Sequence, residues 1–294
     1  MVKRSKRAIL RPLPTSTEVK VPARLHVLFA RDTSQALVIR RGPSKATCTA
    51  GWDRRDDTFT MGQWLRGRIY ERRSDLSPDG QHFIYFAMNG RWRSPTRGSW
   101  SAISRAPYLK AVGLWAKGDC WHGGGLFLSS RSYWLNGMHF SVPASVDGLK
   151  QCSPPPPPPH GNNECLGVYF IRLLRDGWTL LGDDKPEVGT YIVRFEKKID
   201  AHWTLRKIAV ATLNKRKPGQ GVYFDEHALV SARGGEVLSK PGWEWADVDE
   251  SRKRIVWAER GCLYAAKLKA GGMQEPELLY DFTPMNFEAI AAPY

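Results

Sequence analysis

Two stretches of the chain share one plan: Asp75-Leu76-Ser77-Pro78-Asp79-Gly80-Gln81-His82-Phe83-Ile84-Tyr85-Phe86-Ala87 and Asp247-Val248-Asp249-Glu250-Ser251-Arg252-Lys253-Arg254-Ile255-Val256-Trp257-Ala258. Each begins as a short strand, continues through a polar turn and ends in a strand of β-branched and aromatic residues that closes on Ala. Such residues favour strands, and the Pro and Gly within residues 77–80 favour a tight turn. The shared plan indicates small antiparallel sheets that repeat along the chain.

Repeated small sheets predict an all-β array, because one such sheet cannot bury both faces until its neighbours stack on it. Four further strand–turn–strand units have turns at residues 31–35, 129–132, 175–177 and 225–227. With the turn at 77–80 their spacing is about 46–51 residues, slightly longer than a usual propeller blade. The unit at 247–258 breaks this spacing, since it follows the turn at 225–227 too closely. We therefore expect a β-propeller of about five blades, with six as the alternative.

The segment 243–282 is predicted to form one complete four-stranded blade, with strands at 245–248, 254–258, 262–268 and 277–282. At this point the chain resembles WD-repeat and TolB-type propellers. Ser77-Pro78-Asp79-Gly80 matches the blade turn of the TolB type, and Trp52-Asp53 is similar to the dipeptide that ends the third strand of a WD repeat. The chain departs from the WD pattern because it lacks a Gly-His dipeptide at each repeat start. The resemblance concerns the fold and assigns no function.

Length and composition predict one folded domain outside a short tail. Residues 1–20 are basic and then contain Pro, Ser and Thr, so we expect a flexible tail followed by a single propeller domain over 21–294. No apolar run reaches the roughly 20 residues that a membrane span needs. Only Ala8-Ile9-Leu10 follows the first basic residues, whereas a secretion signal needs about 7–15 apolar residues. Five cysteines without a CxxC pair fit a reducing compartment. These features predict a cytoplasmic protein.

A proline run interrupts the repeats at about 150–165. Six prolines at 154–159 favour a stiff polyproline II segment and exclude an interior strand. We interpret the segment as an exposed inserted loop. The alternatives are a docking site for a proline-binding module and a metal site formed by Cys152, His160 and Cys165, whose spacing matches no standard zinc pattern.

The formal net charge of +15 is concentrated near the N-terminus. Residues 1–105 contain 21 Lys and Arg against 8 Asp and Glu, a net of +13, whereas residues 106–294 contain 23 against 21, a net of +2. Arg suits phosphate and carboxylate partners because its planar fork of donors also stacks on aromatic rings. The alternative is a core of aromatic rings with arginines paired to nearby acids. The candidate binding surface comprises Arg66, Arg68, Arg72, Arg73, Arg91, Trp92, Arg93, Arg97 and Arg105.

A second candidate is a ligand pocket around a run of three glycines. Consecutive glycines let the backbone approach a ligand or a neighbour closely. The run lacks the spacing of nucleotide-binding loops, so a turn that lets blades pack is the alternative. The candidate pocket residues are Asp119, Trp121, His122, Gly123, Gly124 and Gly125.

These patterns favour a non-catalytic interaction platform whose Arg-rich face binds a protein, with an acidic protein or nucleic acid as further partners. One alternative is a propeller hydrolase or lyase, which requires three or more acidic or His side chains to converge on one axial pocket. A sequence-independent nucleic-acid binder is the other. No GxSxG, HExxH or EF-hand pattern is present, and we expect no cofactor or metal. Residues near predicted strand ends that could join an axial cluster, or merely cap turns, are Asp75, Glu226, His227, Asp247 and Asp249.

Overall fold

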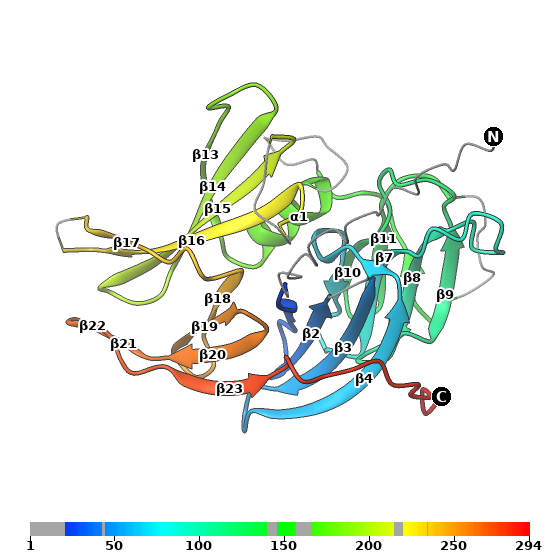
Figure 1. The fold of residues 1–294 in the computed structure, drawn as a ribbon, viewed down its shortest axis with the longest axis horizontal. Coiled ribbons are helices and arrows are strands. Elements are labelled where there is room, and N and C mark those ends of the chain that lie inside the picture. Colours follow the sequence, from blue (N-terminus) through cyan, green and yellow to red (C-terminus); the bar gives the residue numbers. More distant parts are fainter. Residues whose placement is uncertain (1–20, 43–44, 140–145, 157–165, 215–219, 234) are drawn as a thin grey trace, which may run out of the picture.

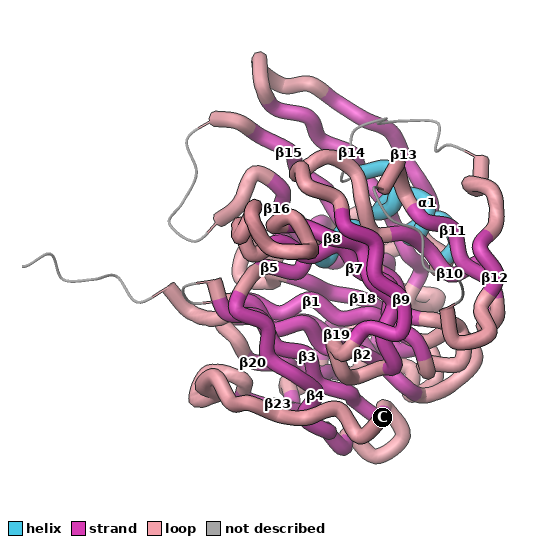
Figure 2. Tube along the Cα trace, turned by 90° about the vertical axis from the view of Figure 1, so that its right-hand side faces the viewer, coloured by secondary structure: helices cyan, strands magenta, loops and turns pink. Residues whose placement is uncertain are grey.

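A computed structural model describes residues 21–42, 45–139, 146–156, 166–214, 220–233 and 235–294. Five sheets arranged in a ring form a five-bladed β-propeller, as Figure 1 shows. The expected fold class and blade number are therefore confirmed. The single described α-helix, Leu166–Arg175, is drawn in cyan in Figure 2, where the molecule is turned by 90°.

The first three blades follow one another along residues 24–151. Blade 1 pairs its four strands in chain order, and in blade 2 the short strands β5 and β6 both pair with β7. Blade 1 consists of β1 (Arg24–Phe29), β2 (Gln35–Arg41), β3 (Ala46–Asp53) and β4 (Thr58–Arg66). Blade 2 consists of β5 (Arg68–Ile69), the 3₁₀ helix η1 (Glu71–Arg73), β6 (Asp75–Leu76), β7 (His82–Met88), β8 (Ser99–Arg105) and β9 (Ala111–Ala116). Blade 3 consists of β10 (Gly125–Ser129), β11 (Ser132–Leu135) and β12 (Lys150–Gln151).

The last two blades are preceded by α1 (Leu166–Arg175), which contacts η1, β10 and β13. Blade 4 has five antiparallel strands, and the end of blade 5 carries the small hairpin β21–β22. Blade 4 consists of β13 (Thr179–Asp184), β14 (Thr190–Lys198), β15 (Trp203–Thr212), β16 (Tyr223–Ser231) and β17 (Val237–Ser239). Blade 5 consists of β18 (Trp245–Asp249), β19 (Arg254–Glu259), β20 (Cys262–Ala266), β21 (Leu268–Lys269), β22 (Gly272–Met273) and β23 (Glu277–Asp281).

The hydrophobic core lies between neighbouring blades. Val27 and Trp52 of blade 1 pack with Val256 of blade 5 and Phe282 just after it, and all four side chains are at most 3% exposed. Blades 1 and 2 meet in a second cluster and blades 2 and 3 in a third, while α1 packs with blades 4 and 5. Neighbouring blades thus cover one another, and between blades 3 and 4 helix α1 contacts both β10 and β13. This is the burial that an isolated sheet cannot achieve.

Ion pairs close the ring between the first and last blades. Arg54 Nη1 lies 2.8 Å from Asp249 Oδ1, and Arg254 Nε lies 3.0 Å from Asp249 Oδ2. Arg254 also donates to Asp57 of blade 1, at 2.6 Å between Nη2 and Oδ1. The side chain of Asp249 is fully buried, so these bonds compensate a carboxylate that could not remain there unpaired.

Two predicted hairpins are wrong. Residues 168–174 belong to helix α1, because Val168, Tyr169 and Leu173 form one buried helical face and Gly177 (φ +84°) ends the helix. Trp178 N–H donates to Leu173 C=O at 3.0 Å, which completes a Schellman-type cap.

Residues 225–227 form no turn either, because they lie inside the continuous strand β16, where ion pairs satisfy the buried polar side chains. The predicted regular spacing therefore fails at this point. The hairpins around 31–35, 77–80, 129–132 and 250–253 and the four strands of blade 5 are confirmed.

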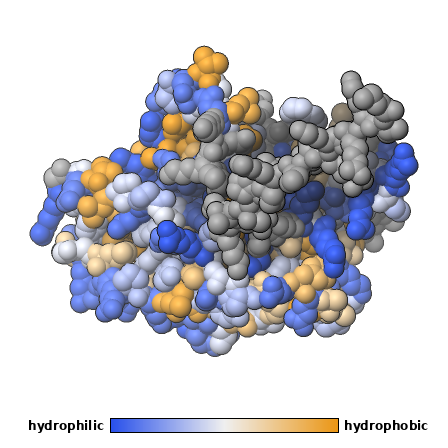
Figure 3. Space-filling view, in the orientation of Figure 1, coloured by the Kyte–Doolittle hydropathy of each residue, from blue (hydrophilic) through white to orange (hydrophobic). Residues whose placement is uncertain are grey.

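Two predicted segments, the N-terminal tail and most of the proline-rich loop, lie outside the residues that the structure describes. The predicted tail at 1–20 and the loop residues 157–165, including His160 and Cys165, lie outside the described residues. Within the described part, no helix is long and apolar enough to cross a membrane. The surface visible in Figure 3 is largely polar, with orange hydrophobic residues at the top of the view. In blade 4 and its loops, the side chains of Leu181, Val188 and Leu213 are exposed.

Candidate functional site: the axial pocket

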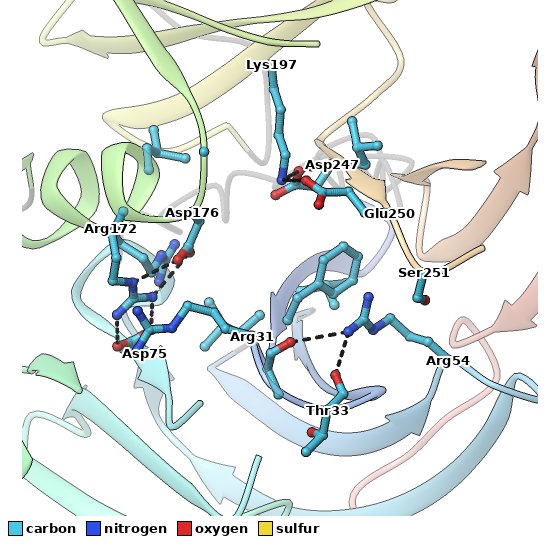
Figure 4. Close-up of a pocket in the computed structure, with 18 of the residues that line it drawn as sticks. Arg31, Thr33, Arg54, Asp75, Arg172, Asp176, Lys197, Asp247, Glu250 and Ser251 are labelled. Atoms are coloured by element: carbon cyan, nitrogen blue, oxygen red, sulfur yellow. Dashed lines mark hydrogen bonds and ion pairs between the residues drawn. The ribbon is translucent and has the colours of Figure 1, made fainter. Parts of the chain in front are cut away.

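A pocket of about 850 Å³ opens at one end of the central axis. The β1–β2 turn, β6, the end of α1, β14 and the β18–β19 turn all contribute to its lining (Figure 4). This volume lies within the range of small-molecule sites. Four blades and a helix therefore supply side chains to one cavity, as a propeller's geometry allows.

One wall carries a guanidinium between two carboxylates. Arg175 Nη1 and Nη2 donate to Asp75 at 2.7 and 2.9 Å, and Nε and Nη2 donate to Asp176 at 2.8 and 3.2 Å. Asp75 is almost fully buried and also accepts Phe127 N–H at 2.8 Å, whereas the side chain of Asp176 is 26% exposed. Asp75 is thus a fixed structural partner, and Asp176 is the more exposed of the two carboxyl groups on this wall.

The opposing wall carries an ammonium between two carboxylates. Lys197 Nζ lies 3.2 Å from Asp247 Oδ1 and 3.4 Å from Glu250 Oε1. Asp247 also accepts Val248 N–H at 2.7 Å, and Trp178 Nε1 lies 3.4 Å from its Oδ2. These donors orient Asp247, while Glu250, with its side chain 75% exposed, stands at the mouth.

The floor of the pocket is a buried hub that joins α1 to blade 4. Tyr169 Oη donates to Asp225 Oδ2 at 2.6 Å, and Arg72 Nη2 lies 2.6 Å from Asp225 Oδ1. Lys207 Nζ donates to His227 Nε2 at 3.2 Å, and its charge lies 4.0 Å from Asp225. The buried polar side chains of this network are hydrogen-bonded or ion-paired to one another, so we interpret the network as the structural base of the pocket.

A second part of the hub lies between two cavities. His26 lines both the axial pocket and a smaller cavity on the other side. Its Nε2 accepts a hydrogen bond of 3.0 Å from Arg172, which also donates to the carbonyl oxygens of Glu71 and Ser74. The fixed positions of these side chains separate the two cavities.

The two walls differ in their proton affinity. Burial raises the pKa of Asp176, and the neighbouring Asp75 carboxylate adds to this while Arg175 opposes it. Burial alone would lower the pKa of Lys197, but the carboxylates of Asp247 and Glu250 raise it. The pocket therefore presents a carboxyl group that holds its proton more strongly than usual, facing carboxylates anchored by a cation.

The structure divides the predicted Arg surface. Arg72 and Arg73 are only 5% and 2% exposed, because Arg72 pairs with Asp225 and Arg73 donates to the carbonyl oxygens of Cys120 and His122. They cannot form part of an exposed surface. Arg105 is exposed but lies at the opposite end of blade 2 from the other arginines and pairs with Asp147 at 2.6 Å.

The remaining members gather at the end of blade 2 that faces away from the axial pocket. β7 starts after the turn at 77–80, next to the pocket, and ends at Met88, which pairs with Arg68. The loop that follows β7 is therefore at the far end, and it carries exposed side chains of Arg91, Trp92, Arg93 and Arg97. Arg66 ends β4 at this same end, where its guanidinium lies over the ring of Phe287.

The six residues predicted around the glycine run do not line the axial pocket. Asp119 pairs with Lys117 at 3.0 Å, and Trp121 and His122 are exposed. Gly123, Gly124 and Gly125 are buried, and a Cβ at Gly124 would overlap the backbone oxygen of Arg73. The three glycines let the loop before β10 pack closely against η1. This agrees with the alternative to a ligand pocket, a turn that lets blades pack.

Of the strand-end residues considered for an axial cluster, Asp75 and Asp247 do line the pocket. Asp249 is in the ring-closing ion pairs and His227 is in the hub, while Glu226 is exposed on β16. Asp176 is absent from the residues predicted for an axial cluster, because helix α1 positions it and residues 168–174 are predicted as a strand. The Gly at 177 was the available signal, since Gly commonly follows the last turn of a helix.

A scan against protein-family models and a search of curated proteins gave no match. Similar solved structures include hydrazine synthase from Kuenenia stuttgartiensis, at 11% identity over 87% of this chain and 80% of that chain, with a TM-score of 0.31. Another is the GH43 protein BlXynB from Bacillus licheniformis, at 10% identity over 94% of this chain and 60% of that chain, with a TM-score of 0.29. The identities limit this likeness to the fold, and TM-scores this low carry no functional argument.

Proposed function

We propose that this propeller is a hydrolase that binds a small hydroxyl-bearing substrate, a glycoside, in the axial pocket. The observation that supports it is the presence of Asp176 and Asp247 on different walls of one polar cavity. Glycoside hydrolysis needs two carboxyl groups beside the scissile bond, one that donates a proton and one that is ionised. The presence of several acidic and His side chains in the lining (Asp75, Asp176, Asp247, Glu250 and His26) also supports the proposal.

Each wall has a role in this reaction. Burial raises the pKa of Asp176, which favours this side chain as the general acid that protonates the leaving-group oxygen as the carbon–oxygen bond breaks. Asp247, oriented by Val248 N–H and Lys197, accepts a proton from the water that attacks the anomeric carbon. The alternating donors and acceptors of Lys197 and Glu250 match sugar hydroxyl groups, which both donate and accept hydrogen bonds.

The test is hydrolysis of a panel of p-nitrophenyl glycosides by the full chain. Asp176→Asn and Asp247→Asn should each lower the rate at least about 100-fold, the usual contribution of a general acid or base. Asp184→Asn is the matched control, because Asp184 lies on β13 outside the pocket with its side chain 49% exposed. Absence of turnover on the whole panel, or wild-type rates in both pocket variants, would contradict the proposal.

A second candidate function is the interaction platform, and a specific observation favours it. The loop after β7 exposes Arg91, Trp92 and Arg93 together at the end of the propeller opposite the pocket. Arginines with an exposed indole suit an acidic protein or a single-stranded nucleic acid, because cations contact phosphates while the ring stacks on a base. We propose this face as a site for such a partner, in a protein that we still expect to be cytoplasmic. It is compatible with an occupied pocket because the two sites face opposite ends.

A further inference from the structure

Arg31 is a cation at the axial pocket whose side chain has no hydrogen-bond partner among the residues that the structure describes. Arg31 belongs to the β1–β2 turn, which is tied to the next blade by Asp32 N–H donating to Pro78 C=O at 2.9 Å. Its side chain extends from the turn toward the wall that holds Asp75 and Asp176 (Figure 4). Among the described residues, the Arg31 guanidinium makes no hydrogen bond and no ion pair within 4.0 Å. A rigid turn thus presents a cation to the cavity.

The neighbouring arginines have no such capacity. Arg175 uses its five N–H groups on Asp75, Asp176 and the carbonyl oxygen of Phe127. Arg172 is buried and donates to two carbonyl oxygens and to His26. Among these three guanidinium groups, Arg31 is therefore the one whose fork of donors can receive a ligand.

The charge balance of the whole pocket favours an anion. Its lining contains eight Lys and Arg side chains against five Asp and Glu side chains, which leaves a net charge of +3. Partial burial lowers the pKa of Arg31, and the like charge of Arg175 lowers it further, while the nearby carboxylates of Asp75, Asp176 and Asp32 oppose this shift. A bound anion would remove this repulsion, and a carboxylate matches the planar guanidinium with two parallel hydrogen bonds.

The geometry points to an acidic sugar as the substrate: we propose that Arg31 binds the carboxylate of a uronic acid residue while Asp247, Lys197 and Glu250 contact its hydroxyl groups. Arg31 is thereby a specificity-determining residue. This inference rests on the proposed glycoside site, and it adds that the wall opposite Lys197 selects for negative charge.

The test compares three probes by titration calorimetry with the full chain: methyl β-D-glucuronide, its methyl ester and methyl β-D-glucoside. The glucuronide should bind at least about tenfold more tightly than the two neutral probes, because a charge-assisted bidentate bond is lost in each of them. Arg31→Gln should reduce this ratio to about one and leave the affinity for the glucoside unchanged. Arg31→Lys, which keeps the charge but not the fork, should restore part of the preference.

Arg55→Gln is the matched control, since Arg55 also lines the mouth but pairs with Asp53 at 2.7 Å and has a side chain 76% exposed. It should keep the wild-type ratio. Equal affinity of the wild-type chain for acid and ester, or a preference that survives in Arg31→Gln, would overturn the inference while the glycoside site stands. Failure of all three probes to bind would overturn the inference together with the proposed function.

Discussion

Arg54 and Asp249 are 195 residues apart in the chain, yet their side chains meet at 2.8 Å between Nη1 and Oδ1. The pair joins the first blade to the last beside the mouth of the axial pocket, which Arg54 also lines. Asp249 in addition accepts hydrogen bonds from Arg254 and Ser251. Closure of the ring and construction of the pocket therefore depend on the same buried charges.

Asp249→Asn should lower the free energy of unfolding by about 3–5 kcal/mol, because it leaves the buried Arg54 guanidinium without its carboxylate and removes one of the two carboxylates that pair with Arg254. Urea unfolding monitored by tryptophan fluorescence measures this change. The control is Asp53→Asn, which disrupts the exposed pair with Arg55 and should cost at most about 1 kcal/mol. Equal stability of the two variants would show that the ring closes without this pair.

Stability should fall as the pH is lowered from 7 toward 5, and His227 should account for part of the slope. Burial, with the charge of Lys207, lowers the pKa of His227 to about 3 in the folded chain. The unfolded chain then binds more protons between pH 6.5 and 3, so the folded state loses stability as the pH falls. Urea unfolding at several pH values measures the slope.

His227→Gln should reduce that slope by up to about 1.4 kcal/mol per pH unit, the value for one proton. Its Nδ1–H donates to Trp243 C=O at 3.0 Å, so the variant will also be less stable at pH 7. The slope, and not the absolute stability, is the readout. His122→Gln, a change at an exposed loop histidine, is the control. An unchanged slope in His227→Gln would show that the pKa of His227 is the same in the folded and unfolded chains.

Gly124→Ala should destabilise the fold by about 2–4 kcal/mol, because a Cβ there adds overpacking against Arg73 to the cost of a positive φ. Gly90→Ala isolates the cost of the positive φ, since Gly90 has the same φ of +71° but no atom within 4 Å of the added Cβ. It should cost about 1–2 kcal/mol. Thermal unfolding of the pair measures the difference, and equal losses would exclude close packing as the reason for glycine at 124.

Charge reversal at the loop after β7 tests the platform. Arg91→Glu with Arg93→Glu should abolish binding of a mixed single-stranded oligonucleotide at low salt, and wild-type binding should weaken steeply as salt is added. Arg131→Glu with Arg233→Glu changes the net charge equally at exposed positions elsewhere and should leave binding nearly intact. Fluorescence anisotropy measures both. Similar losses in the two double variants would indicate attraction to net charge without a defined face.

The sequence predicted the class of fold because the blade hairpins depend on local patterns. Strand residues around the turn at 77–80 and the four strands of blade 5 could be located from alternation and turn chemistry alone. The helix α1 could not, because its ten residues include β-branched and aromatic side chains that also suit a strand. The turn expected at 225–227 failed because Asp225 and His227 are satisfied by Arg72 and Lys207 from other elements.

The residues of the pocket were also predictable only in part, because local sequence patterns do not show which distant elements meet in the fold. Asp75 and Asp247 stood near predicted strand ends, so they could be considered for an axial cluster. That Asp176, Lys197 and Arg31 face the same cavity depends on how α1 and blade 4 dock against the ring, which no local pattern encodes. Burial of Arg72 and Arg73 likewise follows from tertiary contacts with Asp225 and the loop before β10.

The most direct test of the proposed axial site is a crystal structure of Asp247→Asn soaked with a mixture of neutral and acidic methyl glycosides. We predict a sugar ring between the two walls, with its glycosidic oxygen within hydrogen-bond distance of Asp176 and a hydroxyl group on Lys197. An empty axial pocket in crystals that hold the same sugars elsewhere on the chain would contradict the proposal.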